Sequence, residues 1–223
     1  MKQFIGEHLE FLKQFRDEFH STGAIAPSSR FVARALTGPF EKRTGPLRVL
    51  EIGPGTGAIT RHIVNLLGPD DRLDLVELNE KFVAMLRHRL EHEPEFRAVA
   101  DRVHLHSCAI QDFQAAEPYD FIISGLPINN FPADLVEEIF SIYFKLLAPH
   151  GQVSYFEYMY VRPLRRLVSG SSERKRLREL DRVISPYLHR HRVRRNWIFV
   201  NLPPAWVQHL RPNKTVENGV HAT

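Results

Sequence analysis

Cysteine is almost absent from this sequence, and long apolar runs are missing altogether. Of the 223 residues only Cys108 is a cysteine, which excludes an internal disulfide and any cysteine-rich zinc site and fits a reducing compartment. The 12 histidines lie in contexts such as HLH and HRHR, without the spacing of metal ligands, so we expect no metal. No run approaches the roughly 20 apolar residues that a membrane-spanning helix needs. These shortages favour a cytoplasmic chain with room for a single globular domain.

From residue 47 onward, short apolar strands alternate with helical stretches. Alternation of this kind predicts an α/β fold, here a mostly parallel sheet of seven strands with helices on both faces. Ligands of such sheets bind at the carboxyl ends of the strands. We expect strands at 47–52, 72–78, 102–106, 119–123 and 151–158, helices near 57–67, 79–91 and 132–147, and two added strands in VRRNWIFVNLPPAWVQHL (193–210).

A glycine-rich turn joins the first of these strands to its helix. VLEIGPGTGAIT (49–60) contains three closely spaced glycines: Gly53, Gly55 and Gly57. Glycine permits a tight turn and lets a ligand lie against the backbone. Glu51 lies at the strand end, where an acid suits a cationic ligand better than a pyrophosphate, and Pro54 interrupts the dinucleotide spacing GxGxxG. Glu77 ends the next strand, where a carboxylate can hold both hydroxyls of a ribose.

The motif ExGPGTG, followed by an acid at the second strand end, resembles the class I S-adenosylmethionine-dependent methyltransferases over roughly residues 45–160. The resemblance implies their Rossmann-like fold and S-adenosylmethionine as cofactor, with S-adenosylhomocysteine as product. It implies that the three glycines line the methionine and ribose, that Glu77 binds the ribose hydroxyls and that Leu78 packs on the adenine. Many members carry an acid just after the third strand. This chain has Ala109 and Ile110 there, whose backbone would recognise the adenine, and a role for Asp112 stays open.

The loop SGLPINNFP (124–132) follows the fourth strand, beside the position of the transferred methyl group. Enzymes that methylate planar exocyclic amines usually place Asn or Asp, Pro, Pro or Leu, and an aromatic residue there. Ser124 and Ile128 replace the polar and aromatic members of that pattern, so the loop favours an aliphatic amine. The alternative is that Phe131 turns toward a base and stacks on it. We expect Ser124, which also borders the cofactor, and the backbone carbonyls of Gly125 and Leu126 to orient the amine.

The strand SYFEYMY (154–160) carries aromatic residues to the same edge of the sheet. Aromatic faces hold methylated ammonium groups by cation–π attraction. With a period of two, Tyr155 and Glu157 share one face while Tyr158 lies on the other. An amine must lose its proton before it attacks a methyl group, and these three side chains are the candidate proton acceptors. The sequence does not rank them, and aromatic packing in the core is the alternative for either tyrosine.

Two segments outside the central part of the domain indicate contact with a membrane surface. Residues 1–22 form an amphipathic helix with four phenylalanines on one face, typical of an interfacial membrane helix or of a cap on the sheet. Residues 162–195 carry 12 basic against 3 acidic side chains, an excess of 9 that indicates a polyanionic partner, either anionic lipid or nucleic acid. We expect the catalytic domain to span 23–211 and the tail, 212–223, to be disordered.

A closer resemblance is to the bacterial phospholipid N-methyltransferases of soluble fold. It rests on SGLP and on three longer segments: STGAIAPSSRFVARAL (21–36), ELNEKFVAMLRHRL (77–90) and NLPPAWV (201–207). The resemblance implies stepwise methylation of phosphatidylethanolamine towards phosphatidylcholine by a peripheral enzyme on the inner face of the membrane. Ser28 and Ser29 would then close over the cofactor or meet the lipid phosphate. The nearest rivals are the rRNA adenine dimethyltransferases, which would show an Asn-Leu-Pro-Tyr loop and a helical C-terminal domain; a small soluble amine is the third alternative.

Overall fold

The computed structural model describes residues 29–42, 44–159, 171–200 and 204–213. The predicted amphipathic helix at 1–22 and Ser28 lie outside the described residues, as do 162–170 of the basic stretch and almost all of the predicted tail.

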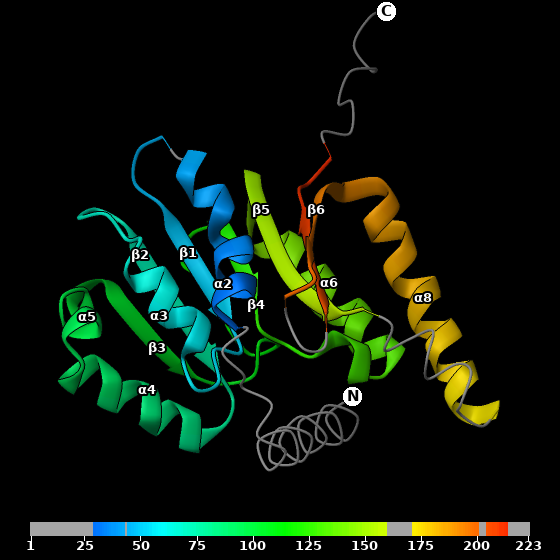
Figure 1. Ribbon diagram of the computed structural model, residues 1–223, viewed down its shortest axis with the longest axis horizontal. Coiled ribbons are helices and arrows are strands. Elements are labelled where there is room, and N and C mark those ends of the chain that lie inside the picture. Colours follow the sequence, from blue (N-terminus) through cyan, green and yellow to red (C-terminus); the bar gives the residue numbers. More distant parts are fainter. Residues whose placement is uncertain (1–28, 43, 160–170, 201–203, 214–223) are drawn as a thin grey trace, which may run out of the picture.

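Seven strands form one sheet, in the order β3-β2-β1-β4-β5-β7-β6 (Figure 1). Strands β1 to β5 pair in parallel, and β7 pairs antiparallel with both β5 and β6. The strand bounds are β1 Arg48–Ile52, β2 Arg72–Glu77, β3 Val103–Ser107, β4 Tyr119–Ser124, β5 Leu147–Tyr158, β6 Arg192–Ile198 and β7 Ala205–Leu210. The sheet confirms the predicted α/β class, including the strand pair added at one edge.

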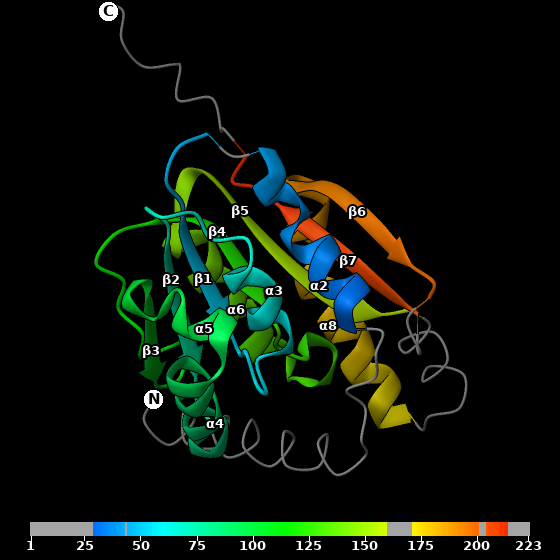
Figure 2. The same cartoon turned by 60° about the vertical axis from the view of Figure 1, so that its left-hand side comes forward.

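Helices cover both faces of this sheet (Figures 1 and 2). Their bounds are α2 Ser29–Thr37, α3 Ala58–Val64, α4 Glu80–His92, α5 Pro94–Arg97, α6 Ala133–Leu146 and α8 Ser171–His191, with short 3-10 turns η1 Gly38–Lys42, η2 Ala100–Arg102 and η3 Ile128–Asn130. Two apolar clusters result. One packs the sheet against α6 and α8, and the other packs it against α2, α3 and α5. The two-sided burial explains why the parallel strands read as nearly continuous apolar runs.

The basic stretch forms part of a helix that was not among those expected from the sequence. Helix α8 spans 21 residues, and its side chains Leu177, Leu180 and Ile184 are fully buried. Their spacing of three and four residues puts them on one helix face, which packs on α6 and the sheet. The charged residues occupy the remaining faces, so the same segment supplies core packing and a basic surface.

Strand β5 sends alternate side chains into the two clusters, as the period of two predicts. Tyr155 packs in the cluster under α6 and α8, whereas Phe156 and Tyr158 pack in the cluster under α2. Glu157 is buried two residues beyond Tyr155. The strand therefore brings a carboxylate to the carboxyl edge on the α8 side of the sheet.

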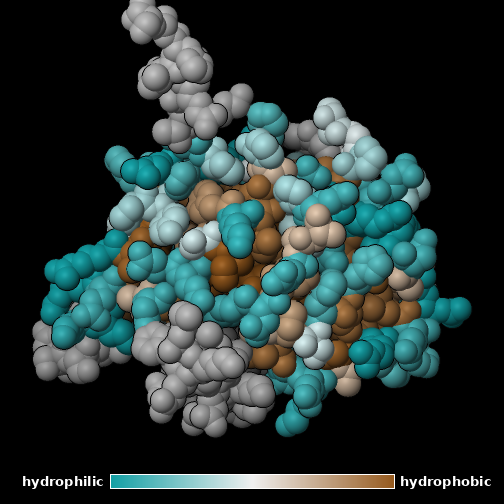
Figure 3. All heavy atoms as spheres, turned by 180° about the vertical axis from the view of Figure 1, so that it is seen from behind, coloured by the Kyte–Doolittle hydropathy of each residue, from teal (hydrophilic) through white to brown (hydrophobic). Residues whose placement is uncertain are grey.

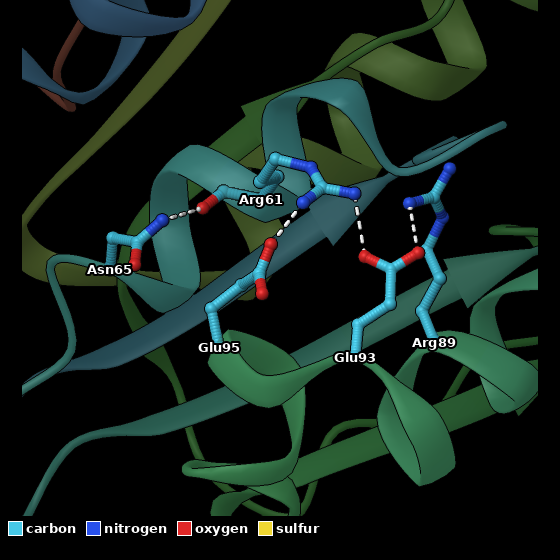
Figure 4. Close-up of polar contacts among 5 residues, drawn as sticks. All are labelled: Arg61, Asn65, Arg89, Glu93 and Glu95. Atoms are coloured by element: carbon cyan, nitrogen blue, oxygen red, sulfur yellow. Dashed lines mark hydrogen bonds and ion pairs between the residues drawn. The ribbon is translucent and has the colours of Figure 1, made fainter.

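Ion pairs fix α3, the helix that follows the glycine turn (Figure 4). Arg61 of α3 pairs with Glu93 at 2.5 Å and also with Glu95, while Arg89 of α4 reaches Glu93 at 2.6 Å. The Asn65 amide donates to the Arg61 carbonyl at 2.7 Å. Each partly exposed pair contributes at most about 1 kcal/mol, so the group orients α3 more than it stabilises the fold.

Figure 3 shows the molecule from behind, where apolar residues lie in separate patches among hydrophilic side chains. Within the described part of the chain, no helix is long and apolar enough to cross a bilayer.

Gly151 gives a direct test of the packing between β4 and β5. A Cβ there would lie 2.7 Å from the Tyr119 carbonyl oxygen and 2.9 Å from Leu147 Cδ2, whereas a Cβ at Gly38 would meet nothing within 4 Å. We expect Gly151→Ala to lower the free energy of unfolding by about 1–3 kcal/mol, because backbone must shift. Gly38→Ala is the matched control and should change it by less than about 1 kcal/mol. Urea denaturation measures both, and equal effects would contradict this packing.

Candidate functional site

Three loops meet at the carboxyl edge of the parallel strands. The Gly53 amide donates to the Val76 carbonyl at 2.9 Å, and the Gly125 amide donates to the Ile52 carbonyl at 2.8 Å. A Cβ at Gly125 would lie only 2.6 Å from the Gly53 carbonyl oxygen. The loop after β4 therefore rests directly on the glycine turn after β1, with no room for a side chain between them.

The three predicted glycines all adopt positive φ, at 71° for Gly53, 59° for Gly55 and 80° for Gly57. This backbone conformation strains residues that carry a Cβ, which explains why all three positions are glycine. Gly57 also lies at the N-cap of α3, where a Cβ would be 3.0 Å from Leu86 Cδ2. The absence of a side chain at Gly57 therefore lets α3 pack closely on α4. Gly53 and Gly55 form the part of the turn beside Glu77.

Glu77 is fully buried and held in one orientation at the end of β2. One carboxylate oxygen accepts the Gly55 amide at 2.9 Å, and the other accepts the Asn79 amide at 2.8 Å. Asn79 in turn caps α4 through the amides of Lys81 and Phe82. A carboxylate oxygen can accept more than one hydrogen bond, so these backbone contacts orient Glu77 in a way that suits the hydroxyls of a diol.

Glu51 lies at the same edge of the sheet, and no hydrogen bond offsets the burial of its carboxyl group. Neither carboxylate oxygen has a hydrogen-bond partner of normal geometry. Burial raises the pKa of Glu51 to about 8, and the negative charge of Glu77 adds to this rise, while the Thr60 hydroxyl lowers the pKa. A buried acid of this kind suits a cation beside it.

An apolar surface lies beside Glu77. Leu78 and Ile110 pack in the same cluster, with Cys108 against it. Ala109 and Ile110 are buried, and the Asp112 amide donates to the Ala109 carbonyl at 3.1 Å. Two aliphatic side chains from neighbouring strand ends can hold a flat ring between them. The predicted role of Asp112 in this recognition stays a prediction.

Buried side-chain contacts hold the loop after β4 in place. The Ser124 hydroxyl accepts the Tyr143 hydroxyl at 2.6 Å and the Leu126 amide at 3.3 Å, and both Ser124 and Tyr143 are fully buried. Ser124 therefore ties the loop to α6, and its expected place beside the amine and the cofactor stays a prediction. Phe131 is also fully buried in the core, so it does not turn toward a base.

The three candidate proton acceptors on β5 have different surroundings. Tyr155 is fully buried, with its ring edge-on to Phe140 at 5.4 Å. Tyr158 lies on the opposite face against Phe156, and burial raises its pKa. The carboxylate of Glu157 accepts the Gln208 amide at 2.9 Å. The structure thus separates Tyr158 from the other two and gives Glu157 a fixed orientation.

Two residues that hold the site were missed in the sequence. Tyr143 fixes Ser124, and the guanidinium of Arg176 donates to the carbonyls of Asn129 and Phe131, which pins the loop from α8. Tyr143 lies 19 residues from its partner and Arg176 lies 47 from Asn129, so no local motif marks them. Among the described residues no cluster of side chains is suited to a metal ion.

The site fits a nucleoside that carries a positive charge. Glu77 can accept hydrogen bonds from a diol, Leu78 and Ile110 can enclose a flat ring, and the buried acid Glu51 suits a cation. On a sheet of this topology they define a site of the S-adenosylmethionine type.

Comparison with known proteins agrees. A family described as methyltransferase domain matches residues 49–151. The chain is 31% identical over 159 residues to an ornithine lipid N-methyltransferase of Singulisphaera acidiphila, covering 70% of this chain and 82% of that protein. It is 35% identical over 92 residues to a tRNA1(Val) (adenine(37)-N6)-methyltransferase of Aeromonas hydrophila, covering 41% of this chain and 37% of that one. An O-methyltransferase from Bacillus cereus, solved in complex with SAH, is similar in fold, with a TM-score of 0.63, 17% identity and coverage of 92% and 91%.

The chain belongs to the S-adenosylmethionine-dependent methyltransferases. S-adenosylmethionine is its cofactor, as the resemblance of the glycine turn implied.

The pKa of Glu51 predicts a pH-dependent stability. Because the folded protein keeps the proton up to about pH 8 and the unfolded chain loses it near 4.5, this group stabilises the fold at low pH and the contribution is lost as pH rises through 8. We expect Glu51→Gln, which stays neutral, to raise the melting temperature of the cofactor-free protein at about pH 8.5 and much less at about pH 5. Scanning calorimetry at both values, with the exposed Glu138→Gln as control, measures this. A difference that does not vary with pH would contradict it.

The buried pair of Ser124 and Tyr143 predicts a non-additive effect on stability. Each of Ser124→Ala and Tyr143→Phe should lower the free energy of unfolding by about 1–2 kcal/mol, because each removes one partner of a buried hydrogen bond. The double variant should cost less than the sum by about 1 kcal/mol. Chemical denaturation of all four proteins completes the cycle. Additive losses would show that the hydroxyls do not depend on one another.

Proposed function

We propose that this chain transfers methyl groups from S-adenosylmethionine to the primary amine of a membrane lipid, with phosphatidylethanolamine as the acceptor. The observation that carries the proposal is the relationship to an ornithine lipid N-methyltransferase across 70% of the chain. Both head groups present a primary aliphatic amine on a lipid, so the class of acceptor is shared even where the head group differs.

The loop after β4 supports an aliphatic amine. Ile128 and Phe131 are buried in the core, so neither offers a ring for stacking on a base. Nucleobase recognition depends on such stacking, which is worth roughly 1–3 kcal/mol per base. The similarity to the tRNA adenine methyltransferase covers less than half of either protein and leaves most of this chain unmatched.

The residues of the cofactor site have distinct tasks in this proposal. Bound S-adenosylmethionine supplies an electrophilic methyl group on a sulfonium. Glu77 would accept the ribose hydroxyls, Leu78 and Ile110 would enclose the adenine, and Glu51 would lie beside the positive charge. Because Gly125 packs on Gly53, the amine-holding carbonyls of Gly125 and Leu126 stand at a fixed place relative to the glycine turn. In-line displacement gains most of its rate from such positioning.

The amine must reach the methyl group without its proton. Of the three candidates, Glu157 is the carboxylate, and Gln208 orients it at the carboxyl edge of β5. The strand register places Tyr155 opposite Ser124, so Glu157 lies two residues further out, level with the substrate loop. We therefore assign proton acceptance to Glu157, with Tyr155 packed behind it.

The membrane partner also remains a proposal. Exposed cations of α8 and β6 offer a surface for anionic lipid, which attracts each one by about 1 kcal/mol. They are Lys175, Arg178, Arg182, Arg190, Arg192 and Arg194. In this proposal the protein binds the inner face of the membrane peripherally, together with residues 1–22.

Acceptor specificity is tested by incubating the protein with methyl-labelled cofactor and one of three acceptors: phosphatidylethanolamine vesicles, ornithine lipid vesicles or bulk tRNA. We expect label in phosphatidylethanolamine, and also in its mono- and dimethylated forms, because the product of each step is still an aliphatic amine. Glu77→Ala should weaken cofactor binding by more than about 100-fold, since two hydroxyls lose a charged acceptor, and should remove label from every acceptor.

If label appears in ornithine lipid alone, the acceptor is still a lipid amine, but phosphatidylethanolamine is wrong as the head group. Label in tRNA, with none in either lipid at any salt concentration, would overturn the proposed function.

A further inference from the structure

Exposed apolar side chains concentrate in one hairpin. Among the described residues six large hydrophobic side chains are exposed, and four of them lie within residues 193–200. Trp197, Phe199 and Val200, here called the hairpin tip, are 51%, 63% and 63% exposed. Single exposed apolar residues need no explanation, but a cluster at the end of a hairpin marks an interaction surface.

The rings of the hairpin form a continuous row. Trp197 stacks on Phe199 with ring centres 5.7 Å apart and meets Trp206 edge-on at 5.6 Å. The guanidinium of Arg195 lies over the Trp206 ring at 5.0 Å. Trp206 is the register partner of Glu157 on β5. The row therefore runs from the hairpin tip to the strand position of the proposed proton acceptor.

The hairpin tip lies on the functional side of the molecule. Because β7 runs antiparallel to β5, its first residue, Ala205, pairs with Tyr158 at the carboxyl end of β5 and with Ile198 of β6. Figures 1 and 2 both show this end of the hairpin on the side toward which β1, β4 and β5 point. A surface that binds the hairpin tip thus faces the same side as the cofactor loops.

Charge around the hairpin indicates an anionic surface. Arg192 and Arg194 are exposed at the start of β6, the end away from the hairpin tip, and Lys175 and Arg178 are exposed on α8, which contacts β6 and β7. Helix α2 packs against β6 and β7, and at its own start Arg30 lies over the exposed Phe31 ring at 4.8 Å. Aromatic rings in contact with arginine, as Trp206 with Arg195 and Phe31 with Arg30, are typical of side chains at the boundary between lipid head groups and acyl chains.

We propose that the hairpin tip inserts Trp197, Phe199 and Val200 into the head-group region of an anionic bilayer. This inference rests on the proposed function, because docking there would bring a lipid head group to the carboxyl edge where Glu157 lies. Aromatic rings beside arginine also suit single-stranded RNA. The aliphatic Val200 at the hairpin end and the lipid relative favour the bilayer.

Tryptophan emission reports on this hairpin alone, since Trp197 and Trp206 are the 2 tryptophans of the chain. The full-length protein is mixed with vesicles of phosphatidylglycerol and phosphatidylcholine, which contain no amine acceptor, and with the same vesicles carrying brominated acyl chains. We expect a blue shift and bromine quenching, both weaker at high salt. In Trp206→Phe the signal comes from Trp197 and should be quenched at least as strongly. Binding by sedimentation without a blue shift or quenching would overturn the proposal, as would absence of binding or a blue shift with RNA only.

Two matched variants separate the hairpin tip from the rest of the strand. Val200→Asn should weaken partition into these vesicles by about fivefold, because an apolar side chain no longer enters the interface. Val193→Asn makes the same change at a residue of similar exposure, 56%, near the start of β6 and roughly 17 Å from its end at Ile198, and should change partition by less than about twofold. Equal effects would overturn the proposal.

The two proposals fail separately. Quenching by vesicles in a protein that methylates no lipid amine would refute the proposed function and keep the docking surface. Methylation of lipid amines without quenching would refute the docking surface and keep the function.

Discussion

The contact between Gly125 and Gly53 is the constraint on which the rest of the site depends. A Cβ at Gly125 would meet the Gly53 carbonyl at 2.6 Å, so the two loops touch through backbone alone. Hydrogen bonds from Gly53 to β2 and from Gly125 to β1 hold each loop to the adjacent strand. The glycine turn and the substrate loop therefore cannot move independently. Their separation is set by the pairing of β1 with β4, whose hydrogen bonds keep neighbouring strands about 4.8 Å apart.

Electrostatics add to this steric arrangement. Glu51 and Glu77 are buried beside the same turn, and the charge of Glu77 contributes to the raised pKa of Glu51. Glu77 has backbone donors on both oxygens, whereas Glu51 has no hydrogen-bond partner. Such a pair is least stable when the site lacks a positive charge and is relieved when one arrives. Part of the attraction for the cofactor would thus come from strain already present in the protein.

The fold and the cofactor were predictable from the sequence because their signals are local. Alternation of apolar strands with helices indicated the parallel sheet, and the glycine turn with Glu77 indicated the cofactor. Three features escaped because they depend on distant contacts. In helix α8 the few apolar residues of the buried face are separated in sequence by charged residues. The orientation of Ser124 depends on Tyr143. The row of rings depends on the register between β5 and β7. The roles of Glu51, Asp112 and Glu157 toward ligands remain predictions.

The position of β7 in the sheet has a consequence for how the chain folds. β7 follows β6 in sequence but lies between β5 and β6. During synthesis β6 therefore emerges before the strand that joins it to the sheet, and one edge of β5, including Val153 and Tyr155, stays open until β7 arrives. An open edge beside apolar side chains is a site for wrong pairing with other chains. The arginines of β6 would repel a second copy of the same strand during that interval, so charges that we propose to bind lipid would also keep the unpaired β6 from pairing with another chain.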